Sequence, residues 1–244
     1  MRRSLLFAVV LGGLAACGKE GGAPATPTPS VTTVSVAINA PADMLKINGV
    51  DVFSATATMS DGTARAVTPV WASDNAAVAT VDGSGKVTGI GSGQATISAI
   101  YETLRGTRAV QIVPDYQGSW TGEYTVTSCQ HSGDFAAVGW CDAALADGLT
   151  SLTMTLTQVR DAVSGQWTHD RMSGAAQGTI ETTGTLPLAG NGYYEGTLIN
   201  IGGWRSVSAD NQNQTGRFTM TFASPTWSGS ADVSVEIRTC TKRS

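Results

Sequence analysis

The fold of this chain is decided by residues 70–100, which read VWASDNAAVATVDGSGKVTGIGSGQATISAI. Short stretches of alternating apolar and polar residues are separated there by Gly, Asp and Asn, which favour turns. A period of two residues is typical of antiparallel strands that bury one face, and the 3.6-residue period of a helix is missing. Residues 34–38, 53–59 and 110–112 continue the alternation. Residues 31–114 are therefore predicted to form a small β-sandwich.

The ordered motifs of this unit resemble the consensus of the bacterial immunoglobulin-like (Ig-like) domain, group 2. They are Val70-Trp71, Val78-Ala79-Thr80-Val81, Gly85-Lys86-Val87 and Gly93-Gln94-Ala95-Thr96-Ile97. The resemblance implies an Ig-like sandwich, and we expect Trp71 to fill the space between its two sheets. Members of this family occur in surface adhesins and cell-wall enzymes, where they act as non-catalytic spacers. The resemblance therefore also implies that this unit is a spacer that presents another domain at the cell surface.

The first sixteen residues have the pattern of a secretory signal. Arg2 and Arg3 precede a ten-residue apolar run, which is too short to span a bilayer as a helix. The run ends in Leu14-Ala15-Ala16-Cys17, which resembles the lipobox of bacterial lipoproteins and implies cleavage before Cys17 and lipidation of its sulfur. The alternative is an ordinary cleaved signal followed by a chance cysteine. We predict a membrane anchor on Cys17 and a location in the cell envelope, at the outer membrane or the cell surface.

Residues 17–30 are predicted to form a flexible tether. Three prolines lie there among Gly, Ala and Thr, and such a stretch cannot bury enough apolar surface to fold by itself.

Residues 115–244 form a second all-β unit by the same criterion. Alternating segments predict eight strands, which we place at 120–127, 149–159, 163–168, 176–182, 193–199, 204–209, 217–222 and 231–238. Turns are expected at Arg160-Asp161, at Gly190-Asn191-Gly192 and at residues 210–213. Consecutive hairpins of this kind favour an antiparallel meander that closes into an eight-stranded β-barrel, with a second β-sandwich as the alternative.

The first and last strands of this unit carry a short motif in addition. Gly118-Ser119-Trp120 together with Arg238 is similar to the Gly-x-Trp motif and terminal-strand Arg of lipocalin-like and avidin-like barrels. In those barrels the Arg packs on the Trp. Here the alternation places Arg238 off the face of Val235 and Ile237.

Three cysteines remain after the signal segment. One disulfide is expected outside the cytosol, and we favour Cys129 with Cys141, whose short loop needs no particular fold. The alternative is Cys129 with Cys240, because the first and last strands of a closed barrel are neighbours. The segment between Cys129 and Cys141 also holds His131, Ser132 and Asp134, but its spacing fits neither a zinc site nor a relayed triad.

Little else in the sequence points to chemistry. Phosphate-binding loops and nucleophile elbows are missing from the sequence, and His169 is expected to be a solvated side chain at a turn. We therefore predict a chain that is not an enzyme and has no cofactor or metal. A net charge of -4 without a basic cluster argues against nucleic acid as a partner.

Binding is predicted to depend on aromatic side chains of the second unit. The candidates are Trp140, Trp167, Tyr193, Tyr194, Trp204 and Trp227. Our leading hypothesis is a non-catalytic surface lipoprotein whose Ig-like stalk presents a β-rich adhesion domain to a glycan, the cell wall or a surface protein. The alternative is a lipocalin-like carrier of a small apolar ligand. The predicted inward set, which includes Trp120, Tyr124 and Phe222, is bulky enough to fill a barrel and disfavours the carrier.

Overall fold

The computed structural model describes residues 30–169, 172–208 and 210–243, and all structural statements concern these residues. The predicted signal segment, the lipid site Cys17 and nearly all of the tether lie outside them. The described chain is all-β apart from two short helices, which confirms the predicted fold class.

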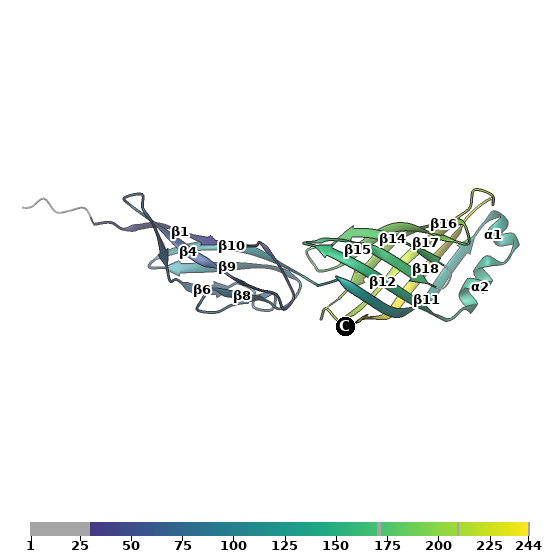
Figure 1. Ribbon diagram of the computed structural model, residues 1–244, viewed down its shortest axis with the longest axis horizontal. Coiled ribbons are helices and arrows are strands. Elements are labelled where there is room, and N and C mark those ends of the chain that lie inside the picture. Colours follow the sequence, from purple (N-terminus) through teal and green to yellow (C-terminus); the bar gives the residue numbers. More distant parts are fainter. Residues whose placement is uncertain (1–29, 170–171, 209, 244) are drawn as a thin grey trace, which may run out of the picture. The chain divides into compact units, whose positions relative to one another are not determined.

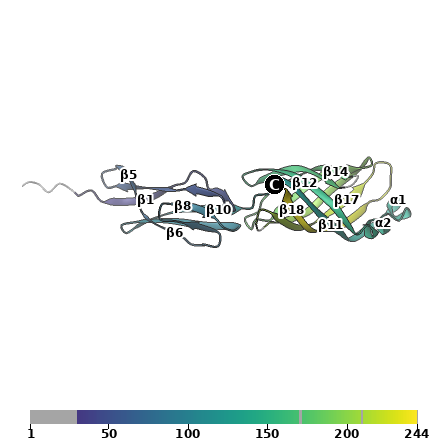
Figure 2. The ribbon, with the colours of Figure 1, turned by 60° about the horizontal axis from the view of Figure 1, so that its bottom comes forward.

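Residues 33–113 hold ten short strands, drawn in purple to blue in Figure 1. They are β1 (Thr33–Asn39), β2 (Met44–Lys46), β3 (Val50–Val52), β4 (Ser54–Met59), β5 (Ala64–Val67), β6 (Val70–Ser73), β7 (Ala79–Val81), β8 (Lys86–Gly89), β9 (Gly93–Tyr101) and β10 (Leu104–Val113). The sheets have the orders β1-β4-β5, β2-β10-β9-β6 and β3-β8-β7. Their strands lie in layers (Figure 2) around one apolar core, which includes Phe53, Val87, Ile97 and Ile112.

Trp71 does not lie at the centre of this core, contrary to our expectation. Its side chain is half-buried and packs against the margin of the core. The reason is topological, since β6 is the edge strand of its sheet and has a neighbour on one side only. The indole lies against Gly85, whose φ of +83° and missing side chain leave room for the ring.

Residues 118–243 form a closed antiparallel barrel of eight strands (Figure 1). They are β11 (Gly118–His131), β12 (Leu149–Val159), β13 (Ala162–His169), β14 (Met172–Thr179), β15 (Leu186–Tyr194), β16 (Thr197–Val207), β17 (Asn213–Ala223) and β18 (Ala231–Arg243). Neighbours in the barrel are neighbours in sequence, and β11 closes it by pairing with β18. The meander and the closed barrel are confirmed, and the second sandwich is excluded.

One of the eight predicted strands, residues 193–199, is wrong, and β15 was not predicted. The turn expected at Gly190-Asn191-Gly192 lies in the middle of β15, and residues 193–199 form a hairpin whose turn is Glu195-Gly196. Both turn residues have positive φ. Gly190 and Gly192 instead let β14 approach, because a Cβ at either position would collide with the carbonyl oxygen of Ala175 or Ser173.

Two helices between β11 and β12 were not predicted. They are α1 (Gly133–Ala137) and α2 (Trp140–Ala146), five and seven residues long. Helices this short span at most two turns, so they leave no readable 3.6-residue period in the sequence. In the part of the chain that the structure covers, every helix is too short or too polar to cross a membrane.

One end of the barrel is filled by large side chains. The Trp204 ring stacks on Phe218 at a centroid distance of 4.4 Å, and the Trp120 Nε1 donates a hydrogen bond of 2.7 Å to the Tyr116 carbonyl oxygen. Lys242 lies over the Trp120 ring, with its Nζ 5.5 Å from the ring centroid. Arg238 is exposed, because it points out of the barrel between the inward Ile237 and Cys240. The cation on Trp120 is therefore Lys242 and not Arg238.

Candidate binding site

The opposite end of the barrel contains a pocket of about 690 Å³. Its strand residues come from the ends of β12, β13, β14 and β15 that lie beside the two helices, and from the neighbouring parts of β11, β17 and β18. Figure 1 shows α1 and α2 at this end. The inward side chains led us to expect a barrel that is filled along its whole length. At this end of the barrel that expectation is wrong.

Five buried side chains point into the pocket from the barrel wall. They are Tyr124, Met172, Met220, Phe222 and Val233, each less than one-tenth exposed. All five occupy inward positions of their strands, which follow from the two-residue alternation of a β-strand. The deep part of the pocket is therefore apolar and aromatic.

Helix α2 provides another wall. The pocket is lined by Trp140, Ala143 and Ala144 of the helix and by its C-cap residue Asp147, at relative positions i, i+3, i+4 and i+7. Residues with this spacing lie on one face of a helix. Two of the four are alanines, whose small side chains leave space between the helix and the barrel. The pocket exists partly because this helical face is not filled.

Aromatic rings gather on two sides of the pocket. Phe222 contacts Trp140 at a centroid distance of 4.3 Å and Tyr194 at 6.4 Å. Elsewhere in the lining, Tyr124 of β11 and His169 of β13 form an edge-to-face contact with their ring centroids 4.9 Å apart. Such ring faces carry a partial negative charge that attracts cations as well as apolar groups.

Polar groups lie at the solvent side of the pocket. Asp147 contributes a carboxylate and is exposed, and Thr150 contributes a hydroxyl from an inward position of β12. Glu123 and Ser151 also border the pocket, but they occupy outward positions of β11 and β12, next to inward residues such as Tyr124. The site thus combines an apolar floor with a polar rim.

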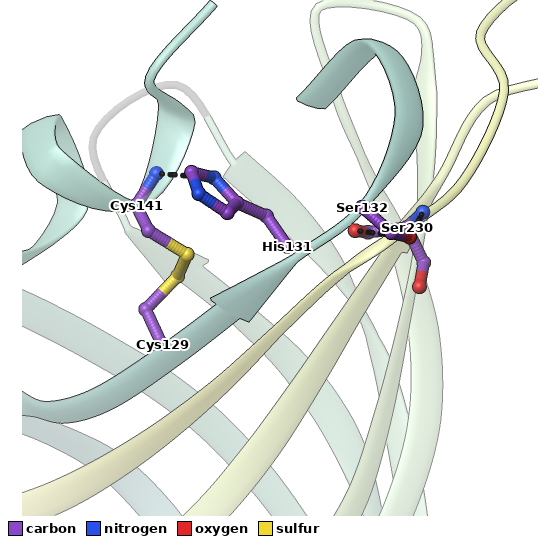
Figure 3. The surroundings of a disulfide bond; sticks show 5 residues. All are labelled: Cys129, His131, Ser132, Cys141 and Ser230. Carbon is purple, nitrogen blue, oxygen red and sulfur yellow. Dashed lines mark hydrogen bonds between the residues drawn. A yellow bond between two sulfur atoms is a disulfide. The ribbon is translucent and has the colours of Figure 1, made fainter. Parts of the chain in front are cut away.

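A disulfide fixes α2 to the barrel wall. Cys129 of β11 is bonded to Cys141 of α2, with the two Cα atoms 5.5 Å apart (Figure 3). The Cys141 backbone N–H also donates a hydrogen bond of 3.3 Å to the Nδ1 of His131. These links hold the residue before Cys141, which is Trp140, beside the pocket. The predicted pairing is confirmed.

The alternative pairing of Cys129 with Cys240 is wrong, although β11 and β18 are indeed neighbours. In their register Cys129 lies opposite Val233, while Cys240 lies opposite Gly122. Cys240 is a free, fully buried thiol. Burial raises the pKa of this thiol to about 11.

His131, Ser132 and Asp134 point to separate partners and do not form a site. Ser132 pairs with Ser230 (Figure 3), and the Asp134 carboxylate accepts a hydrogen bond of 2.7 Å from the Ser228 backbone N–H. These contacts anchor the start of α1 to the loop between β17 and β18. Within the described ranges, no cluster of three or more His, Cys, Asp or Glu side chains could hold a metal ion.

The six predicted binding aromatics are dispersed over the barrel. Trp140 and Tyr194 line the pocket, while Trp167 and Trp204 are buried inside the barrel. Tyr193 and Trp227 are on the surface, 61% and 41% exposed. They therefore do not form a single stacking platform.

Three lining residues were assigned other roles from the sequence. Tyr124 and Phe222 were expected to be ordinary core residues, and His169 a solvated residue at a turn. His169 is half-buried against Tyr124 because it is the last inward position of β13. The spacing of Trp140, Ala143, Ala144 and Asp147 fits one helical face, but α2 is too short for this spacing to identify a helix from the sequence.

Comparison with known proteins identifies the first unit. Residues 30–112 match the bacterial Ig-like domain (group 2). The match covers about a third of the chain and confirms the resemblance of its motifs. No curated protein matches the sequence.

Two solved structures are similar to parts of the chain. A crystal structure of an intimin mutant from EHEC O157:H7 has 20% identity over 46% of this chain and 57% of that chain, with a TM-score of 0.24. Domains 1–6 of the surface layer protein SbsC have 11% identity over 82% of this chain and 39% of that chain, with a TM-score of 0.31. The chain thus spans less than two thirds of either structure. Because both TM-scores are low, neither similarity carries an argument about function.

Proposed function

We propose that this chain is a non-catalytic surface lipoprotein whose Ig-like domain acts as a stalk and whose barrel is a head that binds a small ligand. The observation that carries the proposal is the pocket of about 690 Å³ in one end of the closed barrel. Pockets of a few hundred cubic ångströms, with an apolar interior and a few polar groups, are typical of small-molecule sites. An eight-stranded barrel is just wide enough to hold one such ligand.

The surface location is supported by the Ig-like match and by the sequence pattern at Cys17. The expected lipid anchor can be tested in the native host. The wild-type chain should partition with membranes, and a Cys17→Ala variant should not. Equal membrane partition of both chains would contradict the anchor without bearing on the pocket.

The binding role can be tested on the chain from Gly18 to Ser244 with N-phenyl-1-naphthylamine, an uncharged dye that fluoresces in apolar sites. We expect saturable binding with one dye per chain. Ala144→Phe should abolish it by filling the space beside α2. Leu145→Phe is the matched control, because Leu145 is exposed on the same helix and does not line the pocket.

A dye that does not bind the wild-type chain, or binds Ala144→Phe equally well, would contradict a binding role for the pocket. Circular dichroism of both variants checks that each retains the wild-type strand content.

A second candidate function is adhesion through the outer surface of the barrel. The specific observation in its favour is the exposure of Tyr193 and Trp227, since exposed aromatic rings can stack on sugars. Binding to a glycan array or isolated cell wall that is lost in Tyr193→Ala and Trp227→Ala, but kept in Ala144→Phe, would favour adhesion over the pocket.

A further inference from the structure

We propose that the outer wall of the barrel carries a second binding site, a groove that takes an uncharged glycan chain. The groove has a volume of about 430 Å³ and lies on β13, β14 and β15. It is separate from the pocket, since the two share no lining residue among those described. The inference does not depend on a ligand in the pocket, and it gives the candidate adhesion surface a site and a chemical class.

The groove results from the order of long and short side chains on these strands. Its outward residues form two rows across the strands, which are Gln166, Ala175 and Asn191 in one row and Ser164, Gln177 and Ala189 in the other. Long amide side chains therefore stand beside short side chains of the neighbouring strands. Between the two rows lie the inward residues Gly165, Ala176 and Gly190. Both glycines are partly exposed, so backbone forms part of the floor.

The hydrogen-bonding groups of the groove suit sugar hydroxyls. Gln166, Gln177 and Asn191 are exposed, and each side chain carries an amide carbonyl oxygen and an NH₂ group. Each amide can therefore accept a hydrogen bond from one hydroxyl group and donate one to another. Ser164 adds a hydroxyl group of its own. These neutral donors and acceptors match an uncharged ligand that is rich in hydroxyl groups, whereas ionised ligands are recognised best by charge-assisted hydrogen bonds.

An aromatic ring continues the groove along β15. Tyr193 is two residues beyond Asn191, so its side chain lies on the same outer face, about 7 Å further along the strand. The side chain is 61% exposed, and Ser173 of β14 lies opposite it. Exposed aromatic rings can stack on the apolar faces of sugars. Amides followed by a ring along one strand suit a chain of sugar units better than a single sugar.

Native gel electrophoresis of the chain from Gly18 to Ser244 tests the proposal. Each gel contains one of three soluble uncharged polysaccharides, which are hydroxyethyl cellulose, glucomannan and dextran, or the charged polygalacturonate. We expect at least one uncharged polysaccharide to retard the chain relative to albumin, and polygalacturonate to retard it less. Retardation by none of the three, or equal or stronger retardation by polygalacturonate, would overturn the proposal.

Substitutions in the groove test where the polysaccharide binds. Ala175→Leu should weaken binding about tenfold by filling the groove, and Ala175 is exposed, so the larger side chain does not disturb the core. Ala162→Leu is its matched control, because Ala162 is exposed on β13 outside the groove. Gln177→Ala should weaken binding about fivefold through loss of a neutral hydrogen bond. Gln130→Ala removes an exposed amide of β11 and should leave binding unchanged.

The role of the ring is tested separately. Tyr193→Ala should weaken binding about fivefold, and Tyr193→Phe, which keeps the ring, should retain most of it. Equal losses in the groove variants and in their two controls would overturn the proposal.

The pocket variant distinguishes the two sites. Ala144→Phe fills the pocket and should bind the polysaccharide like the wild-type chain. Loss of polysaccharide binding in this variant would assign the glycan to the pocket and overturn the groove. A wild-type chain that binds the polysaccharide but not the dye would instead contradict only the proposed function of the pocket. The two failures are therefore distinguishable.

Discussion

Removal of the Cys129–Cys141 disulfide should destabilise the barrel by about 3 kcal/mol. The two cysteines are 12 positions apart, so the bond closes a short loop of the unfolded chain. In the chain-entropy model a loop of that length stabilises the native state by about 3 kcal/mol, since it reduces the freedom of the unfolded ensemble.

Urea unfolding followed by tryptophan fluorescence measures this difference. Five of the six tryptophans lie in residues 115–244, so the signal reports mainly on the barrel. The oxidised wild-type chain should be more stable than the reduced chain by about 3 kcal/mol. The double variant Cys129→Ala, Cys141→Ala should resemble the reduced chain and should not respond to reductant.

Cys240→Ala is the control for this experiment, because it removes a thiol that takes no part in the bond. It should keep the full response to reductant. A response below about 1 kcal/mol in the wild-type chain, or a response that disappears in Cys240→Ala, would refute the reasoning.

Three further predictions concern other features of the barrel. Gly165→Ala should lower the free energy of unfolding by about 2 kcal/mol in urea titrations, because its Cβ would collide with the Thr155 carbonyl oxygen, whereas Gly83→Ala has open space and should change little. Lys242→Met should cost about 1 kcal/mol in the same assay through loss of the contact with the Trp120 ring and of the ion pair with Asp115, and Arg238→Met should have almost no effect. The pKa of Cys240 is about 11 in the folded chain against 9.0 when unperturbed, so between pH 9 and 11 the unfolded state binds fewer protons and stability should fall with rising pH. The fall due to this thiol is about 1.4 kcal/mol per pH unit, and a Cys240→Ala chain titrated in parallel should show a correspondingly shallower decline.

The architecture could be predicted from the sequence because it depends on local patterns. Alternation and turn residues located most strands of both units, and the Ig-like motifs identified the first. Alternation failed at Gly190 and Gly192, because the sequence does not distinguish a glycine that forms a turn from one that admits a neighbouring strand. Lys242 was missed for a related reason, since the two-residue rhythm of β18 is interrupted at Arg238 and Thr239, opposite Glu123.

The pocket could not be predicted from the sequence. The residues of its floor are the same large side chains that fill the other end of the barrel, so their composition alone suggested a solid core. Whether Tyr124 and Phe222 meet other side chains or a space depends on α2, and α2 is too short to be recognised by its period. The pairing of Cys129 with Cys141 was predicted correctly, but its role in holding Trp140 required the structure.

The pairing of β11 with β18 also determines when the barrel can be completed during synthesis. Ser119 pairs with Arg243, so the last hydrogen bonds of the sheet must wait until residue 243 has been made. Until then β11 and β17 both present open edges that can pair with other chains. The Ig-like unit ends at Val113 and can fold while the rest is still emerging, and the Cys129–Cys141 bond can form early because its loop is short. The barrel therefore has the longest exposure to misassembly in the molecule, and folding helpers that bind open strand edges would act mainly on it.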